Sequence, residues 1–151
     1  MLPSERLAAA HIVLPEPVAP IGSYLPAKQA GQQIHTSGQL PIDAGGRLVA
    51  GRLGAGLQVA AGQRAARIAA LNAVAAAAGV AGHVDEIKQV LRVTVFVNSV
   101  PGFTDQPQVA DGASDVLFEI FGEDGRHVRS AVGVAALPRD AAVEVELIVG
   151  I

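Results

Sequence analysis

The sequence contains no cysteine among its 151 residues. Disulfide bonds and thiolate metal sites are therefore excluded, and the composition suits a reducing compartment. The first eleven residues include an acidic side chain and lack the basic segment and long apolar run of a secretory signal peptide. Together these observations predict a cytoplasmic protein.

Aromatic residues are also scarce, at 3% of the chain, whereas hydrophobic residues make up 50%. Most of the hydrophobic side chains are alanine and valine, which predicts a core of small, closely packed side chains. The length fits one domain, so we expect a single domain over residues 1–151. Because small side chains bury little surface, we expect association of subunits to supply additional burial.

The sequence has no excess of positive charge and no long uninterrupted apolar run. Its net charge is −3 and it has no basic cluster, so no nucleic-acid partner is expected. The apolar run Ala73–Ala78 is far shorter than the ~20 residues that span a membrane, so no membrane partner is expected. No metal site is expected, because the histidines lack ligand spacing: His11, His35, His83 and His127.

Hydrophobic periodicity predicts strands, a helix, a strand, a second helix and two final strands, an α+β order. Apolar residues at spacings of three and four predict helices over Leu57–Ala78, ended by Gly79, and over Val109–Phe121, ended by Gly122. β-Branched residues on both faces predict a central strand over Val90–Val97.

The N-terminal third of the chain begins with an extension, residues 1–20, that ends in a proline-rich connector. Ser4 is expected to cap a short helix running through Ala10. Alternating patterns predict strands over residues 24–29 and 33–40, joined by a turn. Asn72, within the apolar stripe of the first long helix, is expected to hydrogen-bond to a neighbouring loop.

The stretch from His127 to Val149 has two alternating runs around Leu137-Pro138-Arg139-Asp140, which predicts two strands paired as a hairpin. In this register Val132 and Val134 share a buried face with the apolar residues of the second run, Val143, Val145 and Leu147. The opposite face then holds an arginine and two glutamates above a floor of small residues: Arg129, Glu144, Glu146, Ala131 and Gly133.

Two interpretations of this charged face are open. Arginine and glutamate on neighbouring strands are most often a solvated ion pair contributing ~0.2–1 kcal/mol. Alternatively, the hollow over Ala131 and Gly133 admits a small anion, because a guanidinium binds a carboxylate through two hydrogen bonds while a glutamate polarises a water.

A resemblance to a known family favours the second interpretation. The stretch from Arg129 to Glu146 resembles the C-terminal signature of the RidA (YjgF/YER057c/UK114) family of enamine/imine deaminases. Four further segments resemble the family's other blocks in the same order: Gly22-Ser23-Tyr24, Thr36-Ser37-Gly38-Gln39-Leu40-Pro41, Leu71-Asn72-Ala73-Val74 and Val93-Thr94-Val95-Phe96-Val97.

The resemblance implies a YjgF, chorismate mutase-like fold, with two helices on one face of a mixed sheet, assembled as a homotrimer with a cleft at each subunit interface. It implies cofactor-free hydrolysis of 2-imino or 2-enamino acids to 2-oxo acids and ammonia. Arg129 would bind the substrate carboxylate, Glu144 would position the attacking water and Tyr24 would close the cleft. Ser37, Gly38 and Ala131 would line the substrate site. Some members carry ribonuclease or translation-inhibitor labels, which the charge of this sequence does not support.

Three departures from the family pattern mark a distinct branch. Gly112 stands where deaminase members have an asparagine, Ala131 where many have cysteine, and Ser23 where a proline usually precedes the tyrosine. We therefore carry two hypotheses: an imine deaminase, and a trimer that binds a small carboxylate or acts as a chaperone without turnover.

Overall fold

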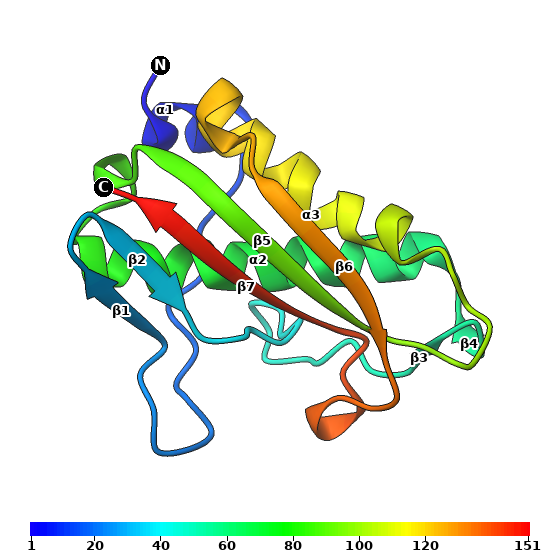
Figure 1. Ribbon diagram of the computed structural model, residues 1–151. Coiled ribbons are helices and arrows are strands. Elements are labelled where there is room, and N and C mark those ends of the chain that lie inside the picture. Colours follow the sequence, from blue (N-terminus) through cyan, green and yellow to red (C-terminus); the bar gives the residue numbers. More distant parts are fainter.

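The computed structural model describes all 151 residues and contains a five-stranded mixed sheet with two long helices on one face (Figure 1). The helices are α1 (Pro3–Ala9), α2 (Val59–Ala81) and α3 (Gln106–Phe121). The sheet strands, in spatial order, are β1 (Ala27–Ala30), β2 (Gln33–Thr36), β7 (Val143–Gly150), β5 (Gln89–Asn98) and β6 (Val128–Val134). The short strands β3 (Arg52–Leu53) and β4 (Gly56–Leu57) pair separately. The predicted fold class, a mixed sheet covered by two helices, is confirmed.

The core is built from small side chains. Alanines of α2 are buried against the valines that β5 and β7 direct toward the helices. Gly112 brings α3 close to α2, because an added Cβ would lie only 2.0 Å from the backbone oxygen of Gln63. Close packing of this kind replaces the large aromatic side chains that the chain lacks.

The two long helices form nearly where periodicity predicts them. α3 ends at Gly122, whose φ of 60° favours glycine, as expected. α2 continues past Gly79 and ends at Gly82, with φ of 100°, so the predicted end was three residues too early. By length and composition α2 could also cross a membrane, which the short run Ala73–Ala78 did not lead us to expect. However, 56% of the apolar stretch of α2 is buried inside the protein, as in the core helix of a globular fold.

The N-terminal predictions need three corrections. The strand predicted over residues 24–29 begins only at Ala27 and ends at Ala30. Ser4 does not cap α1, which begins after Leu2. Its backbone N–H and hydroxyl instead donate to Asp85, at 2.8 and 2.7 Å, because that carboxylate lies at the start of α1 and accepts both. The strand predicted over residues 33–40 ends at Thr36, and pairing with β7 resumes only at Gln39, which bridges Val145.

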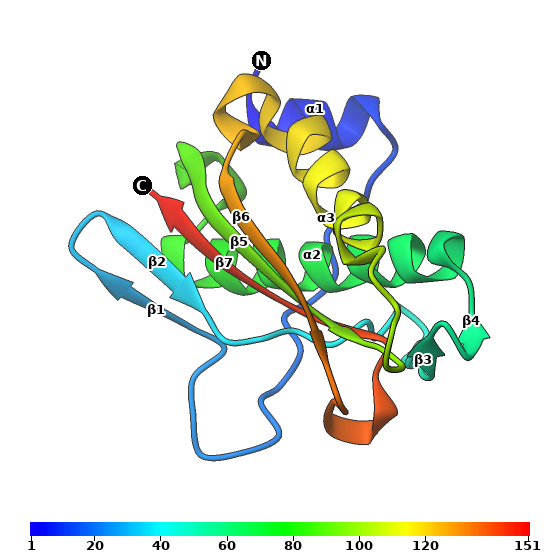
Figure 2. The ribbon, with the colours of Figure 1, turned by 45° about the vertical axis from the view of Figure 1, so that its right-hand side comes forward.

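The predicted hairpin of the last two strands is wrong. β5 lies between β6 and β7, parallel to β6 and antiparallel to β7 (Figure 2). A strand that is apolar on both faces is stable in the middle of a sheet, where both of its edges find hydrogen-bond partners. The connection from β6 to β7 crosses the end of β5, where the fully buried Asn98 side chain donates to Ala141 O at 3.0 Å and Asp140 Oδ1 at 2.9 Å.

This strand order reverses the predicted faces of β6. Arg129 pairs with Val93 of β5, and Val93 in turn pairs with Leu147 of β7. The side chain of Arg129 therefore points to the helix side of the sheet, as do those of Val143, Val145 and Leu147. Glu144 and Glu146 point to the other side of the sheet, which no helix covers (Figure 1). Val132, expected in the core, is 44% exposed on that open face.

Candidate functional site

The Arg129 guanidinium lies between β6 and α3, with 24% of its side chain exposed. Its Nη1 donates to Asp111 Oδ1 at 2.9 Å and to Ser114 Oγ at 3.1 Å, and its Nη2 donates to Pro107 O at 3.3 Å. The Nε–H and one N–H of Nη2 donate to no atom of the chain. The arginine is thus held by α3 while two of its donors stay available.

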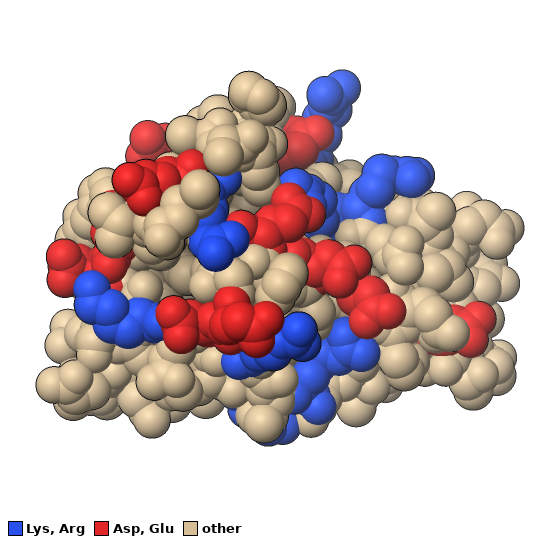
Figure 3. Space-filling model, turned by 90° about the horizontal axis from the view of Figure 1, so that it is seen from above, with Lys and Arg blue, Asp and Glu red and all other residues tan.

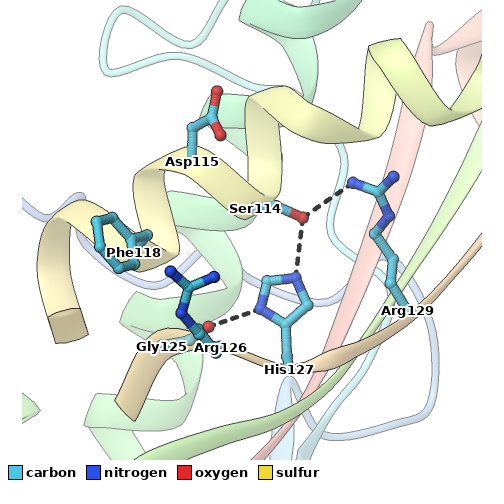
Figure 4. A pocket seen from close by; sticks show the side chains of 7 residues that line it. All are labelled: Ser114, Asp115, Phe118, Gly125, Arg126, His127 and Arg129. Carbon is cyan, nitrogen blue, oxygen red and sulfur yellow. Dashed lines mark hydrogen bonds between the residues drawn. The ribbon is translucent and has the colours of Figure 1, made fainter. Parts of the chain in front are cut away.

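A hollow of about 420 Å³ opens beside this arginine at the ends of α3 and β6 (Figure 4). Its other lining residues are Ser114, Asp115, Phe118, Gly125, Arg126 and His127. Arg126 stacks over the Phe118 ring at 5.2 Å from its centre and pairs with Glu123 at 2.8 Å. Phe118 is the only hydrophobic residue among those that line the hollow, and Arg129 is the cation most buried in its wall.

Glu144 lies on the opposite face of the sheet, half-buried, in a second cavity of about 250 Å³. Burial raises the pKa of its carboxyl group, and the neighbouring charge of Glu146 raises it further. Gly38 lies directly against this carboxyl group, since an added Cβ would be 2.6 Å from Glu144 Cδ. The absence of a side chain at Gly38 is what lets the glutamate sit there.

Tyr24 and Pro26 line the same cavity as Glu144, together with residues 18–21 of the N-terminal segment. Tyr24 is 47% exposed, and its hydroxyl accepts only a long hydrogen bond, 3.4 Å, from the N–H of Ile21. Ser37 is adjacent but turned away, because its hydroxyl donates to Leu25 O at 2.5 Å. The N-terminal extension therefore contributes a wall of this cavity.

Asn72 fixes the loop that follows Gly38. Its side-chain amide, almost fully buried in α2, donates to Leu40 O and Ile42 O, both at 3.0 Å. This confirms the predicted contact between Asn72 and a neighbouring loop, and it makes α2 a support for the Glu144 cavity.

The chain therefore has two half-sites on opposite faces of one sheet. We call them the arginine half (Arg129 with its α3 partners) and the glutamate half (Tyr24, Gly38 and Glu144). The prediction that Arg129 converges with Glu144 and Glu146 within one chain is wrong, because β5 separates β6 from β7. For the same reason the alternative, an ion pair between Arg129 and a glutamate of the neighbouring strand, is also wrong. Ala131, half-buried on the helix side of β6, belongs to the arginine half.

Comparisons with known proteins identify the family. Residues 4–150 match the family described as "YjgF/chorismate_mutase-like, putative endoribonuclease". Protein TCP17 of Trypanosoma cruzi is 49% identical over 139 residues, which cover 91% of this chain and 87% of that protein. A 2-iminobutanoate/2-iminopropanoate deaminase of Dermatophagoides farinae is 32% identical over 140 residues, covering 91% and 94% of the two chains. The chain belongs to the RidA family.

A crystal structure of a Shewanella oneidensis protein agrees over the full length of both chains, with a TM-score of 0.95 and 39% identity. The match includes the N-terminal extension of this RidA-family protein. That segment is therefore a shared part of the fold in at least one relative, consistent with its place in the wall of the glutamate half.

The ribonuclease part of the family description finds no support on the face seen from above. Figure 3 shows acidic and basic side chains interspersed there, with no continuous basic surface of the kind that phosphate binding needs. The absence of a nucleic-acid partner remains a prediction for this RidA-family protein. No cluster of three or more His, Asp or Glu side chains has metal-binding geometry.

Two residues of the arginine half were missed by the sequence analysis, Asp111 and Ser114. They are three residues apart on α3 and so share a helix face beside the buried stripe. Helical periodicity alone could have put them on one face, but only the position of β6 shows that this face meets Arg129. At Gly112, between them, the family's asparagine is excluded by the contact with Gln63.

Proposed function

We propose that this RidA-family protein hydrolyses reactive 2-imino or 2-enamino acids to 2-oxo acids and ammonia. The observation that carries the proposal is the mostly buried Arg129, which has two unused N–H donors beside an open hollow. The name of the Dermatophagoides farinae relative, a 2-iminobutanoate/2-iminopropanoate deaminase, supports the same chemistry.

In the proposed reaction Arg129 binds the substrate carboxylate. A guanidinium stays cationic at every working pH, and its planar geometry fixes the orientation of the bound acid. Asp111 already neutralises part of this charge, but it is 51% exposed and bonded only to Nη1, so the other edge of the guanidinium can take the ligand.

Glu144 acts on the attacking water. Its ionised carboxylate takes a proton from water as the oxygen bonds to the imine carbon, and it then passes that proton to the nitrogen, which gives a neutral carbinolamine. Glu144 next takes the proton of the carbinolamine hydroxyl group and delivers it to the amino group, so that the C–N bond breaks, ammonia leaves and the C–O bond becomes the carbonyl of a 2-oxo acid. A positioned base of this kind typically contributes ~10²–10⁴-fold. Tyr24 would shield the reacting centre, and Gly38 and Ala131 would line the space around it. Ser37, whose hydroxyl donates to Leu25 O, would support the Gly38 loop instead of lining this space.

The two half-sites meet, in this proposal, between subunits of a homotrimer. One chain cannot bring Arg129 and Glu144 to a single small ligand, because they face opposite sides of the sheet. The helix-free face supports association, since Val128 and Val132 are 61% and 44% exposed there. The arginine half of one subunit would then face the glutamate half of the next, which predicts a solution mass of three chains.

The test couples the purified protein to an amino-acid oxidase that generates a 2-imino acid, and measures the rates of imine loss and ammonia release. Wild-type protein should accelerate both, and Arg129→Ala should abolish the acceleration. Arg64→Ala, an exposed arginine on α2, should match wild type. Unchanged activity in Arg129→Ala would refute the carboxylate-binding role. If the wild type binds pyruvate yet never accelerates imine loss, the protein is a non-catalytic carboxylate binder.

A further inference from the structure

A continuous chain of hydrogen bonds runs from Arg129 through Ser114 to His127 (Figure 4). Ser114 Oγ lies 3.1 Å from Arg129 Nη1 and 2.8 Å from His127 Nε2. His127 Nδ1 lies 2.6 Å from the backbone oxygen of Gly125. These residues come from α3, from the turn that precedes β6 and from β6 itself. The hydrogen bonds therefore connect three segments of the protein around the guanidinium.

The direction of each hydrogen bond follows from the chemistry of the atoms. A backbone carbonyl oxygen can only accept, so His127 Nδ1 must carry the proton that it shares with Gly125. In the neutral ring Nε2 is then an acceptor, and the Ser114 hydroxyl donates to it. The lone pairs of Ser114 Oγ are thereby directed to the Arg129 N–H. Burial lowers the pKa of His127, and together with the charge of Arg129 it outweighs the hydrogen bond to Gly125 O, which raises that pKa, so the neutral form is favoured.

We propose that His127 is a positioning residue for Arg129, acting through Ser114. The inference rests on the proposed function only in that Arg129 binds a carboxylate. Neutral His127 holds the Ser114 hydroxyl in one orientation, and Ser114 in turn holds Nη1 against α3. The remaining anchors of the guanidinium are the half-exposed Asp111 and the long contact to Pro107 O, which leave its outward edge less fixed.

Ser114 and His127 also have the spacing of a nucleophile and its base, but their surroundings argue against that role. Ser114 lies in the middle of α3, where backbone N–H groups are used in the helix. No pair of free backbone donors is therefore available beside Ser114 Oγ to stabilise an oxyanion. Orientation of Arg129 is the function that the contacts support.

The experiment measures the affinity for pyruvate, a small 2-oxo acid, by calorimetry on the full-length protein. Ser114→Ala removes the hydrogen bond to the charged guanidinium, and His127→Leu removes the acceptor that orients the Ser114 hydroxyl, so each should weaken binding about tenfold. Ser114→Thr keeps the hydroxyl group and should bind pyruvate with the affinity of the wild-type protein. Ser4→Ala is a matched control, because it also removes a serine hydroxyl bonded to a charged group, Asp85, which is not a hydrogen-bond partner of Arg129, Ser114 or His127.

A second readout needs no ligand. Nitrogen-15 NMR of the imidazole should show His127 neutral at pH 7 with the proton on Nδ1. A proton on Nε2, or pyruvate affinity unchanged in both Ser114→Ala and His127→Leu, would overturn the inference. Loss of binding in Arg129→Ala with normal binding in those two variants would refute the positioning role alone. If Ser114→Ala and His127→Leu weaken pyruvate binding but the wild-type protein does not accelerate imine loss, only the proposed deaminase activity is refuted.

Discussion

Replacing a helical glycine by alanine should raise the stability of the protein at one position and lower it at another, depending on the room for the added Cβ. At Gly79 of α2 the nearest atom to an added Cβ is Pro17 Cγ at 3.6 Å, an ordinary contact. At Gly62 the nearest atoms are side-chain carbons of Leu53 and Val109 at 3.0 and 3.1 Å. At Gly112 of α3 the nearest atom is a backbone oxygen at 2.0 Å.

The expected magnitudes follow from two competing effects. Replacing a helical glycine by alanine stabilises a helix by up to ~1 kcal/mol, and Gly79→Ala should gain that amount. Gly112→Ala must move α3 away from α2 by about 1.4 Å, the difference between 3.4 Å, where ordinary contact begins, and 2.0 Å. Overpacking of this kind costs ~1–3 kcal/mol. Because a backbone carbonyl cannot rotate away, we expect a net loss of about 2 kcal/mol.

Thermal unfolding followed by circular dichroism, at one protein concentration, measures these differences. Relative to wild type, Gly79→Ala should raise Tm by about 2–4 °C and Gly112→Ala should lower it by about 4–8 °C. Gly62→Ala should fall between them, since its neighbours are side chains that can shift. Gly112→Asn should be destabilised like Gly112→Ala. If Gly112→Ala were as stable as Gly79→Ala, the close contact between α2 and α3 would be refuted.

Three further predictions concern the glutamate half. Burial and the charge of Glu146 raise the pKa of Glu144, and the ionised form is the base, so activity should rise with pH through a pKa above the usual glutamate range. In pH–rate profiles Glu146→Gln should move this rise in activity to lower pH. An unmoved profile would contradict the effect of Glu146 on Glu144. Gly38→Ala should reduce kcat about 100-fold by displacing the Glu144 carboxyl group, in steady-state kinetics with an unchanged fold. Asn72→Ala should lower the free energy of unfolding by ~1–3 kcal/mol in urea titration, because two carbonyl oxygens lose their donor.

The local patterns of the chain were sufficient for its elements. The spacing of apolar residues and the glycine at position 122 predicted α3, and the alternation along β7 correctly separated Val143, Val145 and Leu147 from Glu144. Hydrogen bonding of Asn72 to a loop was predictable because a buried amide needs partners. These properties depend on residues within a few positions of one another, so the sequence contains them directly.

The composition of the two half-sites depended on the tertiary structure. Alternation tells which residues of a strand share a face, but it does not tell which strand lies next to it. The insertion of β5 between β6 and β7, held by Asn98, turned Arg129 toward Asp111 and Ser114 and left Glu144 on the other face. Residue types and periodicity were determined by the sequence alone; their partners were decided by contacts between distant segments, which no local pattern encodes.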